Sequence, residues 1–388
     1  MGTPKPIDWV ETTLGEVIEN YDYKRIPLNS RDRAKRQGIY PYYGASGIID
    51  YIDDYIFDGR YLLIAEDGEN LNSRKTPVAF FANGKFWVNN HAHIVRSIVG
   101  VSDDYFLMSY IQNMNISGYI TGAAQPKLSQ ANLNSIKITL PPLPIQRRIA
   151  DILSAYDNLI ENNMQRIRIL EQMAQAIYEE WFGMVDKESL PKGWELKPFS
   201  ELVDIDPKTS VDKQIEKPFV GMNALSETSM IIDSSLIEMR AGNSGAKFQN
   251  RDVLFPRITP SVENGKGAFV QFLKDGQVSI GSTEIIVFRE KELNAEYIYF
   301  LSREHEFRGN AINSMVGASG RQRVQQKCFD SFMVAKPPKK LLDKFADVVS
   351  PMFKITYTLA LKNANLRQTR DLLLPRLVSG EIGITDKT

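Results

Sequence analysis

Residues that could do metal or acid–base chemistry are sparse in this chain. Its histidines are His91, His93 and His305. His91 and His93 stand two apart, so in a strand both rings would lie on one face, where they could hold a metal ion. No cysteine or carboxylate accompanies them at a spacing known from metal sites. A structural or surface pair is therefore the favoured interpretation.

The acidic residues Glu66, Asp67 and Glu69 in "AEDGEN" could form a carboxylate cluster, but an acidic turn at a strand end is commoner. The chain has no Gly-rich nucleotide loop, no serine-hydrolase elbow, no His-Glu-x-x-His and no Asn-Pro-Pro-Tyr or Asp-Pro-Pro-Tyr methyltransferase motif. A triad assembles in space, so spacing alone does not exclude one. The lack of any motif predicts a chain without catalytic residues, a metal site or a cofactor of its own.

Basic and polar clusters are more informative. Between residues 24 and 36 six cations face one acid, Asp32, and the tyrosine-rich "YPYYGASG" follows. Arginines beside aromatic and small residues suit phosphate clamping and contacts to base edges. The candidate nucleic-acid contacts in the first half are Lys24, Arg25, Arg31, Arg33, Lys35, Arg36, Tyr42, Tyr43, Ser46, Gln125 and Lys127.

The second half offers a comparable set in loops that glycines make flexible. Its candidates are Arg240, Asn243, Lys247, Arg257, Lys266, Arg321, Gln322 and Arg323. For each cluster alone, a solvated charged loop is the alternative. Recurrence at corresponding places in the two halves favours a shared binding role.

Composition describes an ordinary globular protein. The chain has 388 residues, 43% of them hydrophobic and 24% charged, which suits two domains or more. A single cysteine, Cys328, fits a reducing cytoplasm. There is no apolar signal core and no run of about 18 apolar residues, so neither secretion nor a membrane is expected. The net charge is zero, so any nucleic-acid surface must be a local patch.

The chain repeats one plan with a period of about half its length. "GAAQPKL" and the following "LPPLPIQRRIADIL" are echoed by "VGASGRQRV" and "AKPPKKLLDKFADVV". Upstream, Trp9 pairs with Trp194 and Arg60 with Arg251. So long a period implies two domains of similar build rather than a solenoid.

The two globular parts, residues 7–140 and 191–336, are predicted to be compact α+β domains. Short β-branched and aromatic runs such as "YLLIA", "HIVRSIV", "DVLFP" and "TEIIVF" predict strands. Short helices are expected at "DDYFLMSYIQNM" and "AEYIYFLSREHEF".

A long helix is predicted after each Pro-Pro pair, the first over residues 145–182, or about 57 Å. Apolar positions alternate in steps of three and four, as in a heptad seam. In the first helix the seam is Leu153, Tyr156, Ile160, Asn163, Ile167, Leu170, Ile177 and Trp181. In the second it is Val349, Met352, Leu359, Leu366 and Leu373.

Each stripe must be buried, and the natural partner of each helix is the other. An antiparallel coiled coil would relate the two halves by a pseudo-twofold axis, with the globular domains at opposite ends. Asn163 on the seam would set the register; a tolerated polar residue at a frayed contact is the alternative. Pro375 is expected to break or kink the second helix near its end.

At this point the chain resembles the specificity subunit of a type I restriction–modification system over nearly its whole length. The resemblance is carried by "GIYPYYGASGIIDYIDDYIFDGRYLLIAEDG", by "GAAQPKLSQANLNSIKITLPPLPIQRRIADIL", by the helix "SAYDNLIENN" to "LEQMAQAIYEEWF", and by "TRDLLLPRLVSGEI". "RQRV" and "AKPPKKL" depart from the family pattern at the second junction.

The resemblance implies target-recognition domains at residues 1–142 and 185–338, a spacer helix at 143–184, and a second spacer helix with the C-terminal tail at 339–388. Each domain would read one part of a bipartite, asymmetric site in double-stranded DNA. The helices would set the separation and dock two modification subunits, and through them the restriction or motor subunits. This chain would do no chemistry, since S-adenosylmethionine for adenine methylation, ATP and Mg would be bound by partners.

Other functions stay open on the residues alone. A recognition subunit of a nuclease-free methyltransferase system would have the same sequence features. A tandem scaffold that binds no nucleic acid, or a self-contained DNA enzyme, would differ in whether the chain binds or modifies DNA by itself.

Overall fold

The computed structural model describes residues 8–384 apart from Ala123, Met184 and Ser319. The N-terminal stretch before residue 8, on which part of the signal-peptide expectation rests, lies outside the described residues. The chain divides into two compact units, Met1–Asn158 with Arg367–Thr388, and Leu159–Leu366. Each long helix contributes one part to each unit.

Unit 1 holds ten strands in three small sheets. The sheet orders are β2-β9-β6-β7, β4-β3-β8-β5 and β1-β10. The strands are β1 Val10–Thr13, β2 Ile18–Asn20, β3 Gln37–Gly44, β4 Gly47–Ile52, β5 Phe57–Asp58, β6 Tyr61–Ala65, β7 Ala79–Ala82, β8 Lys85–Val88, β9 Ala92–Ser97 and β10 Lys137–Leu140. The helices of this part are α1 Ser30–Ala34, α2 Asn70–Ser73, α3 Asp104–Asn113 and α4 Gln130–Ser135, with short 3₁₀ turns η1 Leu14–Glu16, η2 Asp22–Lys24 and η3 Ser117–Tyr119.

Strand β6 shows why the apolar runs fold as they do. All five of its residues are buried, and successive side chains point to opposite faces. Leu62 and Ile64 enter one hydrophobic cluster, whereas Tyr61 and Leu63 enter another. A strand covered on both faces needs a continuous apolar sequence, and "YLLIA" supplies one.

Unit 2 repeats this plan strand for strand. Its sheet orders are β12-β19-β16-β17, β14-β13-β18-β15 and β11-β20, which match those of unit 1 when each strand number is raised by ten. The strands are β11 Glu195–Pro198, β12 Val203–Ile205, β13 Lys217–Val220, β14 Ile237–Arg240, β15 Ala246–Phe248, β16 Val253–Pro256, β17 Ala268–Phe269, β18 Ser279–Gly281, β19 Ile285–Glu290 and β20 Met333–Lys336. The predicted duplication is confirmed.

The short helices of unit 2 are α6 Phe199–Leu202, α7 Ala295–Leu301, α8 His305–Asn313 and α9 Cys328–Ser331, with 3₁₀ turns η4 Met222–Ala224 and η5 Ser234–Leu236. The segment "AEYIYFLSREHEF" therefore begins two helices, because Glu304 is extended between them. In unit 1 the predicted helix is α3, where the Asp103 carboxylate caps the helix by accepting from the backbone N–H groups of Tyr105 and Phe106.

Two helices of 40 residues each, α5 Leu143–Phe182 and α10 Lys339–Val378, follow the paired prolines. The expected break at Pro375 is wrong: α10 continues to Val378, and the Pro375 carbonyl still accepts from the Ser379 N–H at 3.1 Å. A proline lacks a donor but keeps its acceptor, so the last turn can close behind it. Among the described residues, no helix is long and apolar enough to cross a membrane.

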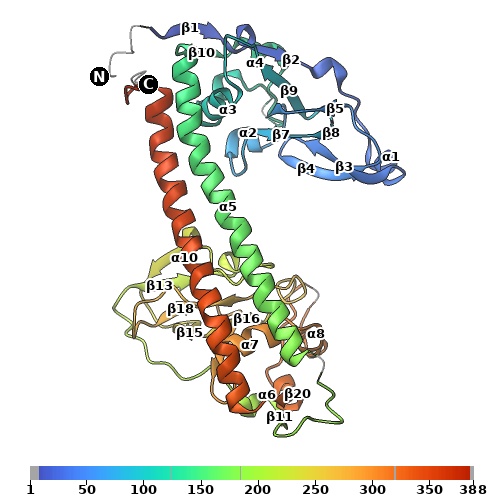
Figure 1. The fold of residues 1–388 in the computed structure, drawn as a ribbon, viewed down its shortest axis with the longest axis vertical. Coiled ribbons are helices and arrows are strands. Elements are labelled where there is room, and N and C mark those ends of the chain that lie inside the picture. The colour runs from blue at the N-terminus through green and yellow to red at the C-terminus, as the bar shows by residue number, and fades with distance from the viewer. Residues whose placement is uncertain (1–7, 123, 184, 319, 385–388) are drawn as a thin grey trace. The chain divides into compact units, whose positions relative to one another are not determined.

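Within each unit the two helices run antiparallel (Figure 1). In unit 1 the beginning of α5 and the end of α10 share a core through Leu153 and Leu377. In unit 2 the end of α5 and the beginning of α10 share a core through Ala174 and Phe353. The α+β class with an antiparallel helix pair is confirmed.

Every predicted seam residue is buried or half-buried in the structure. Leu153, Ile160, Asn163, Val349 and Leu359 are buried. Half-buried are Tyr156, Ile167, Leu170, Ile177, Trp181, Met352, Leu366 and Leu373. Near the end of α5 the buried stripe moves by one residue, to Tyr178 and Phe182. A straight helix of 3.6 residues per turn drifts against a 3.5-residue repeat in this way.

The seam asparagine has a defined partner. The Asn163 side-chain amide donates to the Asn363 Oδ1 at 2.8 Å, and the Asn363 amide donates to the Ile160 carbonyl at 3.2 Å. Both asparagines are buried. A mutual hydrogen bond inside an apolar seam forms in only one register, which favours the register interpretation over a frayed contact.

Candidate nucleic-acid interface

The "GAAQPKL" segment of unit 1 is a loop closed by its own backbone. Thr121 and Lys127 exchange two backbone hydrogen bonds of 2.8 and 2.7 Å. Gly122 has φ 85°, and a Cβ there would lie 2.3 Å from the Gln125 carbonyl oxygen. Only glycine fits this position.

Two further backbone bonds fasten this loop to the end of β6. The Leu128 N–H donates to the Glu66 carbonyl at 2.7 Å, and the Gly68 N–H donates to the Pro126 carbonyl at 3.0 Å. The loop therefore lies at the end of β6, a central strand of its sheet. Its Gln125 side chain is exposed to solvent.

Unit 2 builds the same loop from a different sequence. Val316 and Arg323 exchange hydrogen bonds of 3.1 and 3.0 Å around Gly317, whose φ is 137°. The Val324 N–H donates to the Arg257 carbonyl at 2.8 Å, and the Thr259 N–H to the Gln322 carbonyl at 3.1 Å. Each bond has its counterpart in unit 1. The repeated sequence pattern therefore corresponds to a backbone arrangement that both units share. We call these two segments the matched loops; they are residues 121–127 apart from Ala123 and residues 316–323 apart from Ser319.

The side chains that support the matched loops differ in charge. In unit 1, Lys127 pairs with Glu66 at 3.3 Å. In unit 2, Arg257 stands where Glu66 stands, and Arg323 instead pairs with Glu284 at 2.7 Å. The Arg257 Nε is buried without a hydrogen-bond partner among the described residues. The two loops thus have the same backbone arrangement but are supported by side chains of different charge.

A buried ionic cluster lies beneath the loop of unit 1. The His93 ring, fully buried, bonds the Asp22 carboxylate through Nδ1 at 2.6 Å and the Leu128 carbonyl through Nε2 at 2.7 Å. Burial alone would raise the pKa of the Asp22 carboxyl, but the hydrogen bond and charge of His93, the Ile94 N–H and Arg25 together bring that pKa below its ordinary value. Both partners of the ring are then acceptors, so both ring nitrogens act as donors.

This cluster is not built for a metal ion. Ligand atoms of Asp22, Glu66 and His93 lie within 4.8 Å of one another, but the Arg25 guanidinium is 2.6 Å from Glu66 and 3.4 Å from Asp22. The positive charge of Arg25 therefore already pairs with the carboxylates of Asp22 and Glu66. The His91 ring lies just outside β9 and bonds Asp67 at 2.7 Å. The two histidines therefore bond different carboxylates rather than facing one site as a pair.

The basic segment of unit 1 divides into bound and free cations. Arg33 pairs with Asp50 and Arg36 with Asp53, each at 2.9 Å. Arg31 on α1 and Lys35 directly after it are exposed and make no ion pair among the described residues. Lys24 is exposed and lies over the Tyr21 and Tyr23 rings. Arg31, Lys35 and Lys24 are therefore the cations of this segment that no carboxylate of the described residues engages.

Three candidates must be reassigned to structural roles. Tyr42 is completely buried, and its hydroxyl bonds the backbone of Leu28. Arg25 is held in the ionic cluster described above. The Lys266 ammonium donates to the Met222 carbonyl at 3.0 Å. Short basic or aromatic stretches do not reveal which side chains fold inward.

The remaining candidates stay accessible. Tyr43 is half-buried against Phe80 and Phe86, and Ser46 is exposed at the tip of the β3–β4 hairpin. Arg240 lies 3.7 Å above the Phe219 ring and pairs with Glu238. Asn243 and Arg321 are exposed, whereas Lys247, Arg257 and Gln322 are half-buried.

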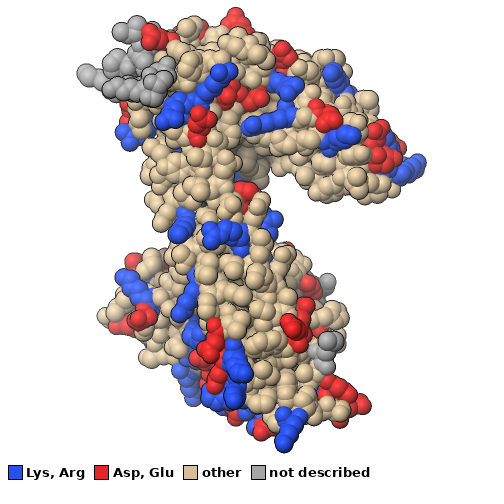
Figure 2. All heavy atoms as spheres, viewed as in Figure 1, with Lys and Arg blue, Asp and Glu red and all other residues tan. Residues whose placement is uncertain are grey.

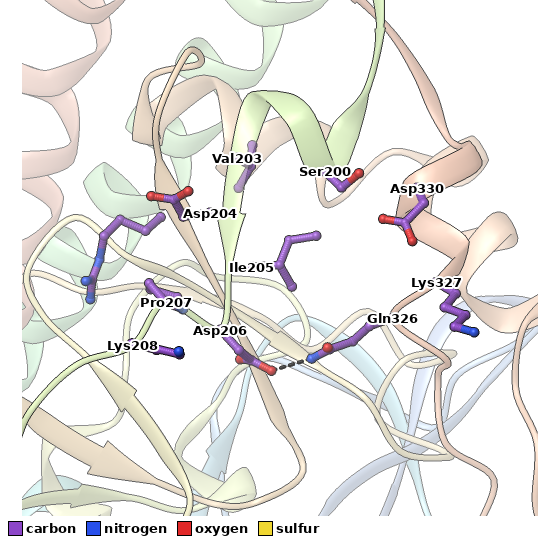
Figure 3. Close-up of a pocket in the computed structure, with 11 residues that line it drawn as sticks. Ser200, Val203, Asp204, Ile205, Asp206, Pro207, Lys208, Gln326, Lys327 and Asp330 are labelled. Carbon is purple, nitrogen blue, oxygen red and sulfur yellow. Dashed lines mark hydrogen bonds between the residues drawn. The ribbon is translucent and has the colours of Figure 1, made fainter.

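Sequence reasoning missed the aspartates that end β2 and β12. Asp206 follows β12, and the Gln326 side-chain amide donates to its carboxylate at the wall of a pocket of about 810 Å³ (Figure 3). Asp204, Lys208, Lys327 and Asp330 also line the pocket, so charges of both signs face it. The available signal was an aspartate just after a short strand in both halves.

Charges on the visible surface are mixed. Figure 2 shows Lys and Arg side chains of the described residues interspersed with Asp and Glu rather than gathered in one field. Any recognition of a polyanion must then use local groups such as Arg31 and Lys35.

Comparison with known proteins points to one family. Residues 6–172 match the family model described as "Type I restriction modification DNA specificity domain". A putative type I restriction enzyme specificity subunit of Haemophilus influenzae is 38% identical over 149 residues, which are 38% of this chain and 37% of that protein. The type I restriction enzyme MjaIX specificity subunit of Methanocaldococcus jannaschii is 23% identical over 98% of this chain and 97% of its own length.

The fold agrees with a solved structure. The S subunit of a type I restriction–modification system from M. genitalium superposes with a TM-score of 0.62 at 14% identity, covering 100% of this chain and 99% of that one. The repeated strand order and antiparallel helices found here thus accompany that sequence similarity. On this evidence residues 6–172 match the type I specificity domain, and the chain as a whole is similar to specificity subunits of type I restriction–modification systems.

Proposed function

We propose that this chain acts as a non-catalytic specificity subunit and reads a bipartite, asymmetric sequence in double-stranded DNA. The observation that carries the proposal is the pair of matched loops, in which one backbone frame is built twice with different side chains. Two readers that differ in side chains recognise two different half-sites, so the target need not be palindromic.

Docking of modification subunits is part of the proposal. In unit 2, helix α5 exposes Leu159, Ile169 and Met173, and α10 exposes Val348 and Ile355. These apolar side chains flank the buried seam. Exposed apolar positions beside a helix pair suit further helices of a partner. Adenine methylation with S-adenosylmethionine, and ATP- and Mg-dependent restriction, are proposed to reside on such partners.

The first experiment is methylome sequencing of a host with and without this chain, which identifies the target. The chain assembled with its modification subunits is then titrated with that target and with a version in which both halves are scrambled. We expect preference for the intact target and affinity that falls steeply with salt. Equal binding to both DNAs would sink the proposal.

The free cations Arg31, on α1, and Lys35, directly after it, allow a more specific test. The double variant Arg31→Ala, Lys35→Ala should weaken binding to every sequence and reduce the salt slope by about two, since each phosphate contact contributes about 0.9. Arg33→Ala is the matched control from the same helix, because its guanidinium is engaged by Asp50. An unchanged slope in the double variant would remove α1 from the interface.

A further inference from the structure

Both units tie an aspartate near a strand end to the segment that follows the matched loop. In unit 1 the Tyr21 N–H donates to the Ile94 carbonyl, and the Ile94 N–H returns to the Asp22 carboxylate, each at 2.8 Å. In unit 2, Asp206 makes both corresponding bonds with Val287, also at 2.8 Å. Asp22 and Asp206 therefore make equivalent hydrogen bonds to β9 and β19.

The second oxygen of each aspartate reaches the loop by different chemistry. The Asp206 carboxylate accepts from the side-chain amide of Gln326, three residues after its loop. The Asp22 carboxylate accepts from His93, whose other nitrogen donates to the carbonyl of Leu128, directly after its loop. One link is an amide and the other is an imidazole, and only the imidazole can lose a proton near neutral pH.

We infer that His93 is a positioning residue for the recognition loop of the first domain, and that it acts as a doubly protonated ring. Two acceptors, a carboxylate and a carbonyl, face its nitrogens, so a neutral ring can satisfy only one of them. A ring that carries one proton therefore leaves either the Asp22 carboxylate or the Leu128 carbonyl without its donor. This inference rests on the proposed reading of DNA by that loop.

The other charged groups around the ring belong to the same cluster. Glu66 lies 3.8 Å from the ring Nδ1, and it is shared by Arg25 at 2.6 Å and Lys127 at 3.3 Å. The Lys127 side chain is about half exposed, whereas Arg25, Asp22 and Glu66 are largely shielded. With a doubly protonated ring these shielded groups comprise two cations and two carboxylates, so their charges balance.

The protonation state is tested on the full chain by NMR of ¹⁵N-labelled histidine. The chain has three histidines, so His91→Gln and His305→Gln assign the His93 signals. We expect both His93 ring nitrogens to carry protons at about pH 6, because each of them faces an acceptor. A ring nitrogen that is bare at about pH 6 would overturn the inference.

The loop is tested with the assembled complex on targets in which one half or the other is scrambled. In His93→Gln, discrimination should fall about tenfold for one half only, the loss expected for one charged hydrogen bond. His305→Gln, an exposed site in unit 2, should behave as wild type. Equal losses in the two halves, or unchanged discrimination in His93→Gln, would refute the inference.

The converse variant is Gln326→Ala, which should lower discrimination in the other half because it removes the amide link. The NMR measurement needs no substitution at His93, so it tests the inference even if His93→Gln misfolds. If the wild-type complex preferred no split sequence, the proposed function itself would fail, whereas a split preference that His93→Gln leaves intact would refute only the role of His93.

Discussion

The two globular parts share a backbone and differ in what fills it. The strand orders and the four backbone bonds of each matched loop correspond. The core of unit 2, however, is aromatic where α5 and α10 meet α7, with Tyr178, Phe182, Tyr297, Phe300 and Phe345 in edge and stacked contacts. The corresponding core of unit 1 is mostly aliphatic.

This difference teaches which features the duplication had to keep. A core tolerates extensive exchange of apolar residues if volume and pattern are maintained. Turns that need glycine, and loops that end sheets, tolerate much less. The two parts therefore share a frame while their packing and surface charge differ, as the proposed reading of two different half-sites requires.

The largest expected effect tests the packing difference. Tyr178→Ala in unit 2 should cost about 3–5 kcal/mol, because the ring is almost fully buried among aromatic neighbours. Leu374→Ala, at the repeat-related position of α10, should cost about 1–2 kcal/mol, because that side chain is only half-buried in unit 1. Urea unfolding of the two variants followed by circular dichroism measures both; equal losses would contradict the comparison.

The next effect concerns aligned arginines. Arg251 binds the buried carboxylate of Glu296 at 2.9 Å, and its replacement by Ala would leave that charge uncompensated at a cost of about 3 kcal/mol. Its counterpart Arg60 is exposed and lies 3.8 Å from the Phe81 ring centre, so Arg60→Ala should cost about 1 kcal/mol or less. Calorimetric melting of both variants gives the ratio, and a larger loss for Arg60→Ala would break the comparison.

The helix pair is joined by a neutral pair in unit 2 and by the ion pair Asp157–Arg370 in unit 1. Asn163→Leu alone should destabilise the chain by about 1–3 kcal/mol, since Asn363 loses its donor inside the seam. Asn163→Leu with Asn363→Leu should recover that loss but relax the register, with added self-association in sedimentation velocity. A double variant as unstable as the single one, and still monomeric, would argue against a register role.

The smallest effect compares how α5 is tied to the globular part of each unit. In unit 1 the Asp157 carboxylate accepts from the Tyr105 hydroxyl, and in unit 2 the Glu171 carboxylate accepts from the Ser229 hydroxyl at 2.7 Å and the Met230 N–H at 2.9 Å. Burial raises the pKa of Glu171, although these hydrogen bonds oppose the shift. An acid with a raised folded pKa binds its proton more tightly in the folded chain, so its contribution to stability falls as pH rises from the ordinary glutamate value through the raised one.

Glu171→Gln removes that penalty while keeping an acceptor for both donors. We expect a gain of up to about 1 kcal/mol near pH 7 that disappears below about pH 4. Glu161→Gln, an exposed site on the same helix, is the control. A stability gain independent of pH would show that ionisation of Glu171 is not the cause.

Much of the architecture followed from local patterns. "YLLIA" is β6, "TEIIVF" falls on β19, and the heptad pattern after the prolines gives two helices of 40 residues. These patterns are readable because strand and helix periods are properties of neighbouring residues. Pro375 was misjudged because a proline's effect depends on which carbonyls find other donors at the end of its helix.

The candidate interface was less predictable. Tyr42, Arg25 and Lys266 have the right chemistry for DNA but lie in packing or backbone contacts. An aspartate after a short strand recurs in both halves, but the pairing of Asp22 with His93 carried no short-range signal, because that hydrogen bond joins residues 71 positions apart.

The amino-acid sequence by itself determined the duplication, the element types, the helix seam and the family resemblance, since all of these are written in periodicity and in short motifs. Tertiary structure alone decided which cations are free, which aspartates support the matched loops, and which histidine is locked between two acceptors. Those outcomes depend on burial and on pairing between distant segments, and the free energy of a buried charge is set by neighbours that the linear order does not place beside it.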